Sequence, residues 1–247
     1  MIQGMSTDDS VSQETQVGHE HPDVTGGWLR PAVFGAMDGL VSNLALIAGV
    51  AGGTRAATNS HAVVLAGLAG LAAGAFSMAA GEYTSVASQS EAAAREIERE
   101  RAEIERHPEH EIRELAEMYA EKGIDEDLAL KVAEQVHRDV DNAVRVHARE
   151  ELGVDPHDLP SPTLAAGSSF VSFALGALVP VLPYLLGANS LLPGLGITLL
   201  ALFICGAVVT QLTNRSWFFG GVRQLVLGGA AAGLTYAVGA AVGSSLG

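Results

Sequence analysis

The sequence is poor in cysteine, in aromatic residues and in positive charge. Its single cysteine, Cys205, excludes a disulfide within the chain, and nothing points to an oxidising compartment. Only 14 of the 247 residues are lysine or arginine, against 28 aspartates and glutamates, so we expect no nucleic-acid partner. The sequence contains no recognisable phosphate-binding loop or nucleophile triad. We therefore expect neither an enzyme nor an organic cofactor.

Apolar residues and glycine are abundant by contrast. The chain is 48% hydrophobic and contains 29 glycines, which is too apolar and too rich in glycine for an ordinary soluble domain. Five apolar runs of roughly 20 residues are each long enough to cross a hydrocarbon core about 30 Å thick. The sequence therefore predicts an all-α membrane protein with five transmembrane helices, at Ala32 to Val50, Ala62 to Ala87, Leu164 to Leu186, Leu191 to Leu212 and Trp217 to Leu246.

Charge is concentrated between spans two and three, where residues 91–160 hold 21 of the 28 acidic and 10 of the 14 basic side chains. This distribution predicts one acidic, water-exposed insert in a membrane protein. We therefore divide the chain into a disordered polar tail (1–27), spans one and two (28–90), a helical metal-binding insert (91–160) and spans three to five (161–247).

The insert is predicted to contain three helices. Neither glycine nor proline occurs from Glu82 to His107, so span two is expected to continue out of the membrane as one long helix. Pro108 then opens a second helix of about 14 residues. A third helix, capped by Asp125, is expected to run through Leu152.

The basic residues outside the insert predict the orientation. Arg30, Arg215 and Arg223 fall on the side of the insert, and only Arg55 opposes them. The N-terminus and the insert are therefore expected in the cytoplasm and the C-terminus outside. The excess of alanine and glycine favours a prokaryotic plasma membrane.

Pairs of glycines four residues apart recur in the spans and allow helix backbones to approach closely, either within one chain or between two copies. The pairs are Gly35/Gly39, Gly49/Gly53, Gly70/Gly74, Gly229/Gly233 and Gly239/Gly243.

An aspartate, Asp38, interrupts the first apolar run. A carboxylate at membrane depth costs about 3 kcal/mol, so it is expected to meet a cation, a proton or a partner, and cation transport is the default interpretation. In span two, Met78 and Glu82 are four residues apart and share one helix face. A buried methionine is usually a packing residue, but a thioether beside carboxylates favours a transition metal over magnesium or calcium. We predict a transport path through Asp38, Met78 and Glu82.

Glutamates three apart recur in the insert, as Glu100-x-x-Glu103 and Glu111-x-x-Glu114. Such pairs share a helix face and repel each other unless salt, arginine or a cation compensates. From spacing alone, a solvated acidic surface is the simpler interpretation, and a shared metal site is the alternative.

Three motifs in this order resemble the vacuolar iron transporter family over roughly residues 28 to 247. They are Asp38-Gly39-Leu40-Val41-Ser42 in span one, Ser77-Met78-Ala79-Ala80-Gly81-Glu82-Tyr83 in span two, and Arg149-Glu150-Glu151-Leu152-Gly153 before span three.

The resemblance implies a homodimer of five-span protomers that exports ferrous iron from the cytoplasm in exchange for protons. It implies a path between protomers lined by Asp38 and Met78. It also implies soluble metal ligands at Glu100, Glu103, Glu111, Glu114 and Glu151. Well-known eukaryotic members carry two adjacent methionines where this chain has His147 and Ala148. His147 can still bind metal through its imidazole, and Mn²⁺, Co²⁺, Ni²⁺ and Zn²⁺ stand beside Fe²⁺ as expected substrates.

Two other functions stay open. Glu134-Gln135-Val136-His137 has the Glu-x-x-His spacing of di-iron carboxylate bundles, which would make the insert a membrane-anchored ferroxidase. The insert is too short for four helices, and one such motif on an exposed helix is usually solvated. A metal sensor that binds ions without transporting them is the third interpretation.

Overall fold

The computed structural model describes residues 27–54, 60–212 and 215–246, and this part of the chain is helical with no strand. The predicted tail, residues 1–27, lies outside the described residues except for Gly27. The helices are α1 (Leu29–Gly53), α2 (Ser60–Arg106), α3 (Pro108–Glu121), α4 (Glu126–Val136), α5 (Val140–Glu151), α6 (Pro162–Leu185), α7 (Leu191–Leu212) and α8 (Trp217–Leu246).

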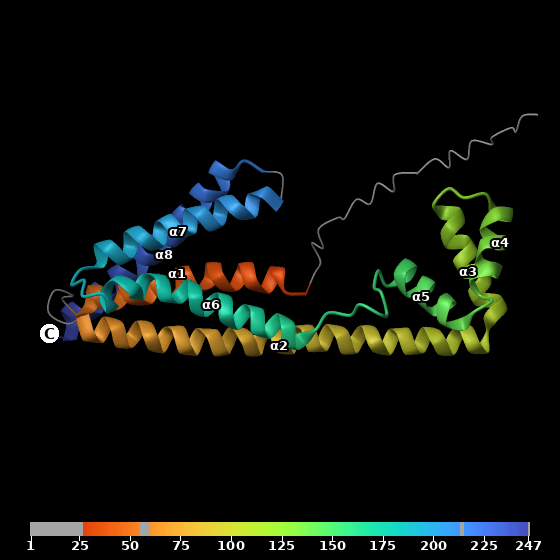
Figure 1. Ribbon diagram of the computed structural model, residues 1–247, viewed down its shortest axis with the longest axis horizontal. Coiled ribbons are helices and arrows are strands. Elements are labelled where there is room, and N and C mark those ends of the chain that lie inside the picture. Colours follow the sequence, from red (N-terminus) through yellow and green to blue (C-terminus); the bar gives the residue numbers. More distant parts are fainter. Residues whose placement is uncertain (1–26, 55–59, 213–214, 247) are drawn as a thin grey trace, which may run out of the picture.

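Five of these helices, α1, α2, α6, α7 and α8, are long and apolar enough to cross a membrane, and they coincide with the five predicted spans. Figure 1 shows α2 running the full length of the molecule, from the bundle of spans to the insert. The prediction that span two continues as one long helix is therefore confirmed. The prediction that Pro108 opens a second helix is also confirmed, and that helix ends before Gly123, whose φ of 91° is the left-handed conformation that glycine tolerates.

The predicted third helix of the insert is wrong, because two helices, α4 and α5, replace it. Asp125 caps α4 as expected, by accepting from the backbone N–H groups of Asp127 and Leu128. Helix α4 ends at Val136, and Asp139 then caps the start of α5, where its side chain accepts from the backbone N–H of Asn142 at 3.0 Å. The Asn142 amide donates back to the carbonyl of Val136 at 3.2 Å. These local side-chain hydrogen bonds compete with helix continuation and stabilise the break.

Contact between backbones at glycines organises the bundle. Helix α1 packs against α6 and α8, α2 packs on α6, and α7 packs on α8. A Cβ on Gly39 of α1 would overlap the carbonyl of Phe173 in α6, and a Cβ on Gly239 of α8 would overlap the carbonyl of Gly49 in α1. By contrast, Gly229 and Gly233 have no neighbour within 4 Å. Four of the five predicted glycine pairs thus pack within the chain: the two of α1, the last pair of α8, and Gly70/Gly74 of α2, which lies against side chains of α1 and α6.

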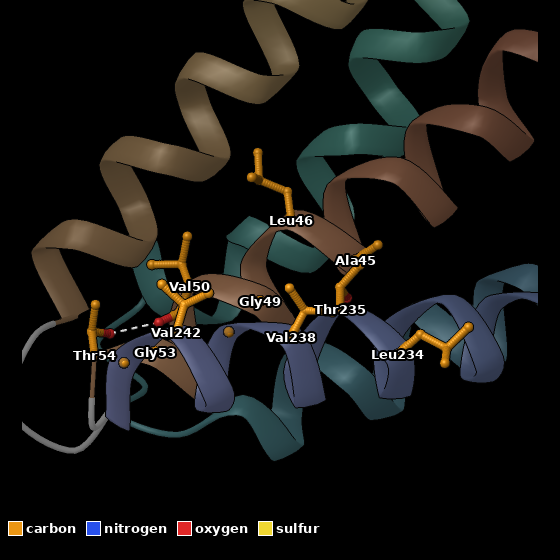
Figure 2. Close-up of a pocket in the computed structure, with 12 residues that line it drawn as sticks. Ala45, Leu46, Gly49, Val50, Gly53, Thr54, Leu234, Thr235, Val238 and Val242 are labelled. Carbon is orange, nitrogen blue, oxygen red and sulfur yellow. Dashed lines mark hydrogen bonds between the residues drawn. The ribbon is translucent and has the colours of Figure 1, made fainter. Parts of the chain in front are cut away.

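An open groove of about 600 Å³ lies between α1 and α8. Figure 2 shows its lining, which consists of small and apolar residues and two threonines from these two helices. Because no carboxylate, imidazole or sulfur lines the groove, it offers no ligands to a metal ion.

The insert packs onto the far end of α2 through apolar contacts. Ile104 of α2 is buried against Ala143 and Val144 of α5, while Leu115 of α3 is buried against α4 at Ala129. Arg101 of α2 adds an ion pair with Asp141 at 2.7 Å. These contacts fix α5 alongside α2, so side chains on the two helices face each other.

The substitution Gly39→Ala is expected to destabilise the protein, because the added methyl group must push the α6 backbone away. Overpacking of this kind costs about 1 to 3 kcal/mol, which exceeds the roughly 1 kcal/mol that alanine gains over glycine in a helix. Thermal unfolding of the purified protein in detergent measures the effect. Gly229→Ala is the matched control and should not lower the melting temperature. Equal effects of the two substitutions would contradict the α1–α6 contact.

Candidate functional site

An open cavity of about 210 Å³ between α1, α2 and α6 brings Asp38 of α1 and Met78 of α2 together. The hydroxyl of Ser42, one turn further along α1, donates to Asp38 Oδ1 at 2.7 Å. Glu82 is half-buried one turn beyond Met78 and is not among the residues that line the cavity. The structure thus joins two of the three predicted path residues. The full lining is Asp38, Ser42, Asn43, Leu46, Gly70, Gly74, Ser77, Met78 and Phe173.

Asn43 lines the same cavity and was missed by the sequence analysis. Its side chain is 2% exposed, and its amide nitrogen donates to the carbonyls of Gly67 in α2 at 3.1 Å and Ala177 in α6 at 2.5 Å. Since both amide hydrogens are used, Oδ1 is fixed on the other side, where it accepts no hydrogen bond within the described part of the chain. It faces Gly70, where a Cβ would lie 2.8 Å from it.

The signal for Asn43 was present in the sequence, because a buried polar side chain in a membrane span needs a partner. The lining of the cavity therefore includes one carboxylate, two hydroxyls, one amide and one thioether.

In the insert, His147 of α5 is fully buried between two glutamates. Its Nδ1 lies 2.7 Å from Glu151 Oε1, one turn along the same helix, and 2.9 Å from Glu100 Oε1 on α2. Glu100 Oε1 is buried and accepts no hydrogen bond from any described residue. Three ligand atoms thus converge at separations typical of neighbouring ligands on a metal with bonds of about 2.1 Å.

A second cluster lies on α3, where His110 Nδ1 is 3.5 Å from Glu111 and 3.6 Å from Glu114. Glu111 is buried although it carries a carboxylate. Glu103 joins neither cluster and instead pairs with Arg99 at 3.2 Å, so its role as a ligand stays a prediction.

The two clusters are close enough for their charges to shift one another's pKa values. Burial, with the nearby charges of Glu100 and Glu114, raises the pKa of Glu111. Burial also raises the pKa of Glu151, against the opposing effect of His147. For His147, burial opposes the charged form, but the two flanking carboxylates outweigh it and raise the pKa. Acidic groups crowded in this way are relieved by a proton or by a metal ion.

The Glu-x-x-His pair does not form a di-iron half-site. Glu134 is exposed and belongs to neither of the candidate clusters found among the described residues. His137 turns its Nδ1 to the carbonyl of Ala133 at 2.8 Å and its Nε2 to Nε2 of His147 at 3.2 Å.

Known proteins resemble this chain in sequence. The sequence matches the VIT family over residues 29–240. The chain belongs to the VIT family. This is a family of transporters, so the protein is not an enzyme.

Among the family's members, the vacuolar iron transporter of Acanthamoeba castellanii is 37% identical, over 90% of this chain and 82% of its own length. Vacuolar iron transporter 1 of Oryza sativa subsp. japonica is 32% identical, over 91% of this chain and 90% of its own. Vacuolar iron transporter 1 of Arabidopsis thaliana is also 32% identical, over 83% of this chain and 84% of its own.

Binding of Co²⁺ to the insert is expected to tighten as the pH rises from about 6 to 8. The raised pKa values of His147, Glu151 and Glu111 mean that these groups hold protons at higher pH than usual, and a bound metal must displace those protons. Calorimetric titration of the full chain with Co²⁺ across this range measures the affinity and the protons released.

Glu91→Gln is the control. It removes an exposed carboxylate of α2 that belongs to neither cluster, and the variant should show the wild-type pH dependence. An affinity that does not change with pH would show that Co²⁺ binds away from the two clusters.

Proposed function

We propose that this VIT-family protein exports divalent transition-metal ions, with Fe²⁺ the first candidate, from the cytoplasm in exchange for protons. The observation that carries the proposal is the cavity that unites Asp38 and Met78, which come from different helices. Relatives named vacuolar iron transporters support the choice of iron.

The donor set of the cavity favours a transition metal. Magnesium and calcium prefer oxygen atoms alone, whereas the Met78 sulfur adds a soft ligand to the oxygens of Asp38 and Asn43. Such a mixture also accepts Mn²⁺, Co²⁺, Ni²⁺ and Zn²⁺.

The insert collects the ion on the cytoplasmic side in this proposal. It has two candidate clusters beyond the spans. One joins Glu100 of α2 with His147 and Glu151 of α5, and the other consists of His110, Glu111 and Glu114 of α3. In Figure 1, the first residues of α1 and of α8 lie at the end of the bundle nearer the insert. The C-terminus lies at the opposite end. Arg30 and Arg223 occupy these beginnings, which by the positive-inside rule supports a cytoplasmic insert, here beneath a plasma membrane.

Proton exchange follows from charge balance. Each elementary charge moved against 100 mV costs about 2.3 kcal/mol, so a divalent ion moving alone stalls unless another ion compensates. Asp38 and Glu82 are the only acidic side chains in the five spans. Competition between metal and proton at these carboxylates couples the two movements without further machinery.

A homodimer is supported by the uncovered face of α1. Phe34, Asp38, Ser42 and Leu46 follow each other at intervals of four and share one face, on which Phe34 is 60% and Leu46 39% exposed. This face carries the cavity's carboxylate, which lipid solvates poorly. A second copy of α1 would cover it and enclose the path.

The substitution Asp38→Asn is expected to lower the initial rate of metal uptake by roughly a hundredfold, because the one carboxylate that the cavity offers to the ion is lost, and losing one partner of a charge pair costs about 2 to 5 kcal/mol. The assay uses purified protein in liposomes that contain a metal-sensitive dye and a pH-sensitive dye. With an acidic lumen on the side opposite the insert, the wild-type protein should carry Fe²⁺ in and protons out.

Asp158→Asn, which changes an exposed carboxylate between α5 and α6, should transport at the wild-type rate. Wild-type uptake by a folded Asp38→Asn protein would overturn the assignment of the path. Metal uptake without proton movement would identify a channel or uniporter instead.

A further inference from the structure

We propose that His137 is a positioning residue, which holds the imidazole of His147 so that its Nδ1 faces the metal bound by Glu100 and Glu151. The inference rests on the proposed function, because it presumes that the insert binds the ion. It concerns a residue that touches neither carboxylate and acts only through its neighbour.

The first step is the orientation of His137 itself. The residue stands at the C-terminal end of α4, where the Ala133 carbonyl accepts the backbone N–H of His137 at 3.0 Å and also faces its Nδ1 at 2.8 Å. A carbonyl oxygen only accepts hydrogen bonds, so Nδ1 carries the hydrogen. The neutral ring of His137 therefore presents an unprotonated Nε2, which can only accept.

The second step transfers this constraint to His147. Its Nε2 lies 3.2 Å from Nε2 of His137, and because the latter accepts, His147 must donate from Nε2. The carboxylates beside Nδ1 hold a second proton on that atom, and a metal ion that displaces this proton leaves the lone pair of His147 on Nδ1. That atom is the one flanked by Glu151 at 2.7 Å and Glu100 at 2.9 Å.

The third step explains why an imidazole needs such support. Turning the ring over exchanges Nδ1 with a carbon atom, and the carbon cannot bind metal. A hydrogen bond to the second ring nitrogen selects the correct face, and metal-bound histidines in proteins nearly always have one. The two rings meet edge to face, with centroids 5.1 Å apart and an interplanar angle of 89°. The break between α4 and α5 makes this meeting possible, because it places His137 opposite the second turn of α5.

The test uses the full chain in detergent with Co²⁺, whose visible absorption reports the geometry of its ligands. His137→Phe keeps an aromatic ring but removes the acceptor, and it should weaken Co²⁺ binding by about 10- to 100-fold and alter the absorption bands. His137→Gln supplies an amide oxygen that accepts the same hydrogen bond, and it should restore most of the affinity. His157→Phe, which removes an exposed histidine outside the clusters, should leave both readouts unchanged.

Comparison of His137→Phe, His147→Phe and the double variant separates this inference from the proposed function. Once His147 is gone, adding His137→Phe should cause no further loss, because His137 acts only through it. If His147→Phe weakens binding and His137→Phe alone does not, the inference is wrong and the metal site stands. If His147→Phe leaves Co²⁺ binding unchanged, the proposed site in the insert fails.

The ligating nitrogen of His147 can also be identified in the wild-type protein, so this test does not depend on whether a variant folds. Nitrogen-15 NMR of histidine-labelled, Zn²⁺-loaded protein should show His147 bound through Nδ1, with a hydrogen on Nε2. Ligation through Nε2 would contradict the proposal.

Discussion

At Gly39 and Gly239 the backbone of α1 touches the backbones of α6 and α8, and this contact determines the geometry of the membrane part of the protein. Lipid provides little hydrophobic drive for helices to associate, so close approach at small residues supplies the packing. It fixes α1 between its neighbours and brings Asn43 within hydrogen-bond distance of carbonyls on both α2 and α6. The Asn43 bonds in turn fix the wall of the cavity that holds Asp38 and Met78.

The unbroken helix α2 connects the two candidate metal sites. Met78 lines the cavity, Glu100 faces His147 in the insert, and both stand on this one helix. At about 1.5 Å per residue, the two positions are roughly 33 Å apart along the axis. In the proposed function, the insert gathers ions well outside the membrane, and an ion then leaves it and travels to the cavity. A collecting site with raised pKa values at His147 and Glu151 suits this role, because protons compete with the metal and ease its release.

Long-range patterns in the sequence predicted the architecture well. The five spans, the extension of α2 and the helix opened by Pro108 all follow from apolar run length and from where glycine and proline fall. The break at Asp139 was missed because short side-chain hydrogen bonds decide it, and neither proline nor glycine marks it. A helix through this point would have left His137 as a solvated surface residue.

The structure brings together some of the residues that the sequence named as a site and leaves others apart. Asp38 and Met78 do meet, and Glu100, His147 and Glu151 do converge. Spacing alone could not show that Glu103 pairs with Arg99, because residues three and four apart lie equally close on a helix. The contribution of Asn43 depends on carbonyls of two other helices, which no local pattern reveals.

The measurement that tests this account most directly is anomalous diffraction from crystals of the protein loaded with Co²⁺. The account predicts one peak bounded by Glu100, His147 Nδ1 and Glu151 and another in the cavity within coordination distance of Asp38. Peaks only on exposed glutamates, with none at His147 and none beside Asp38, would contradict it.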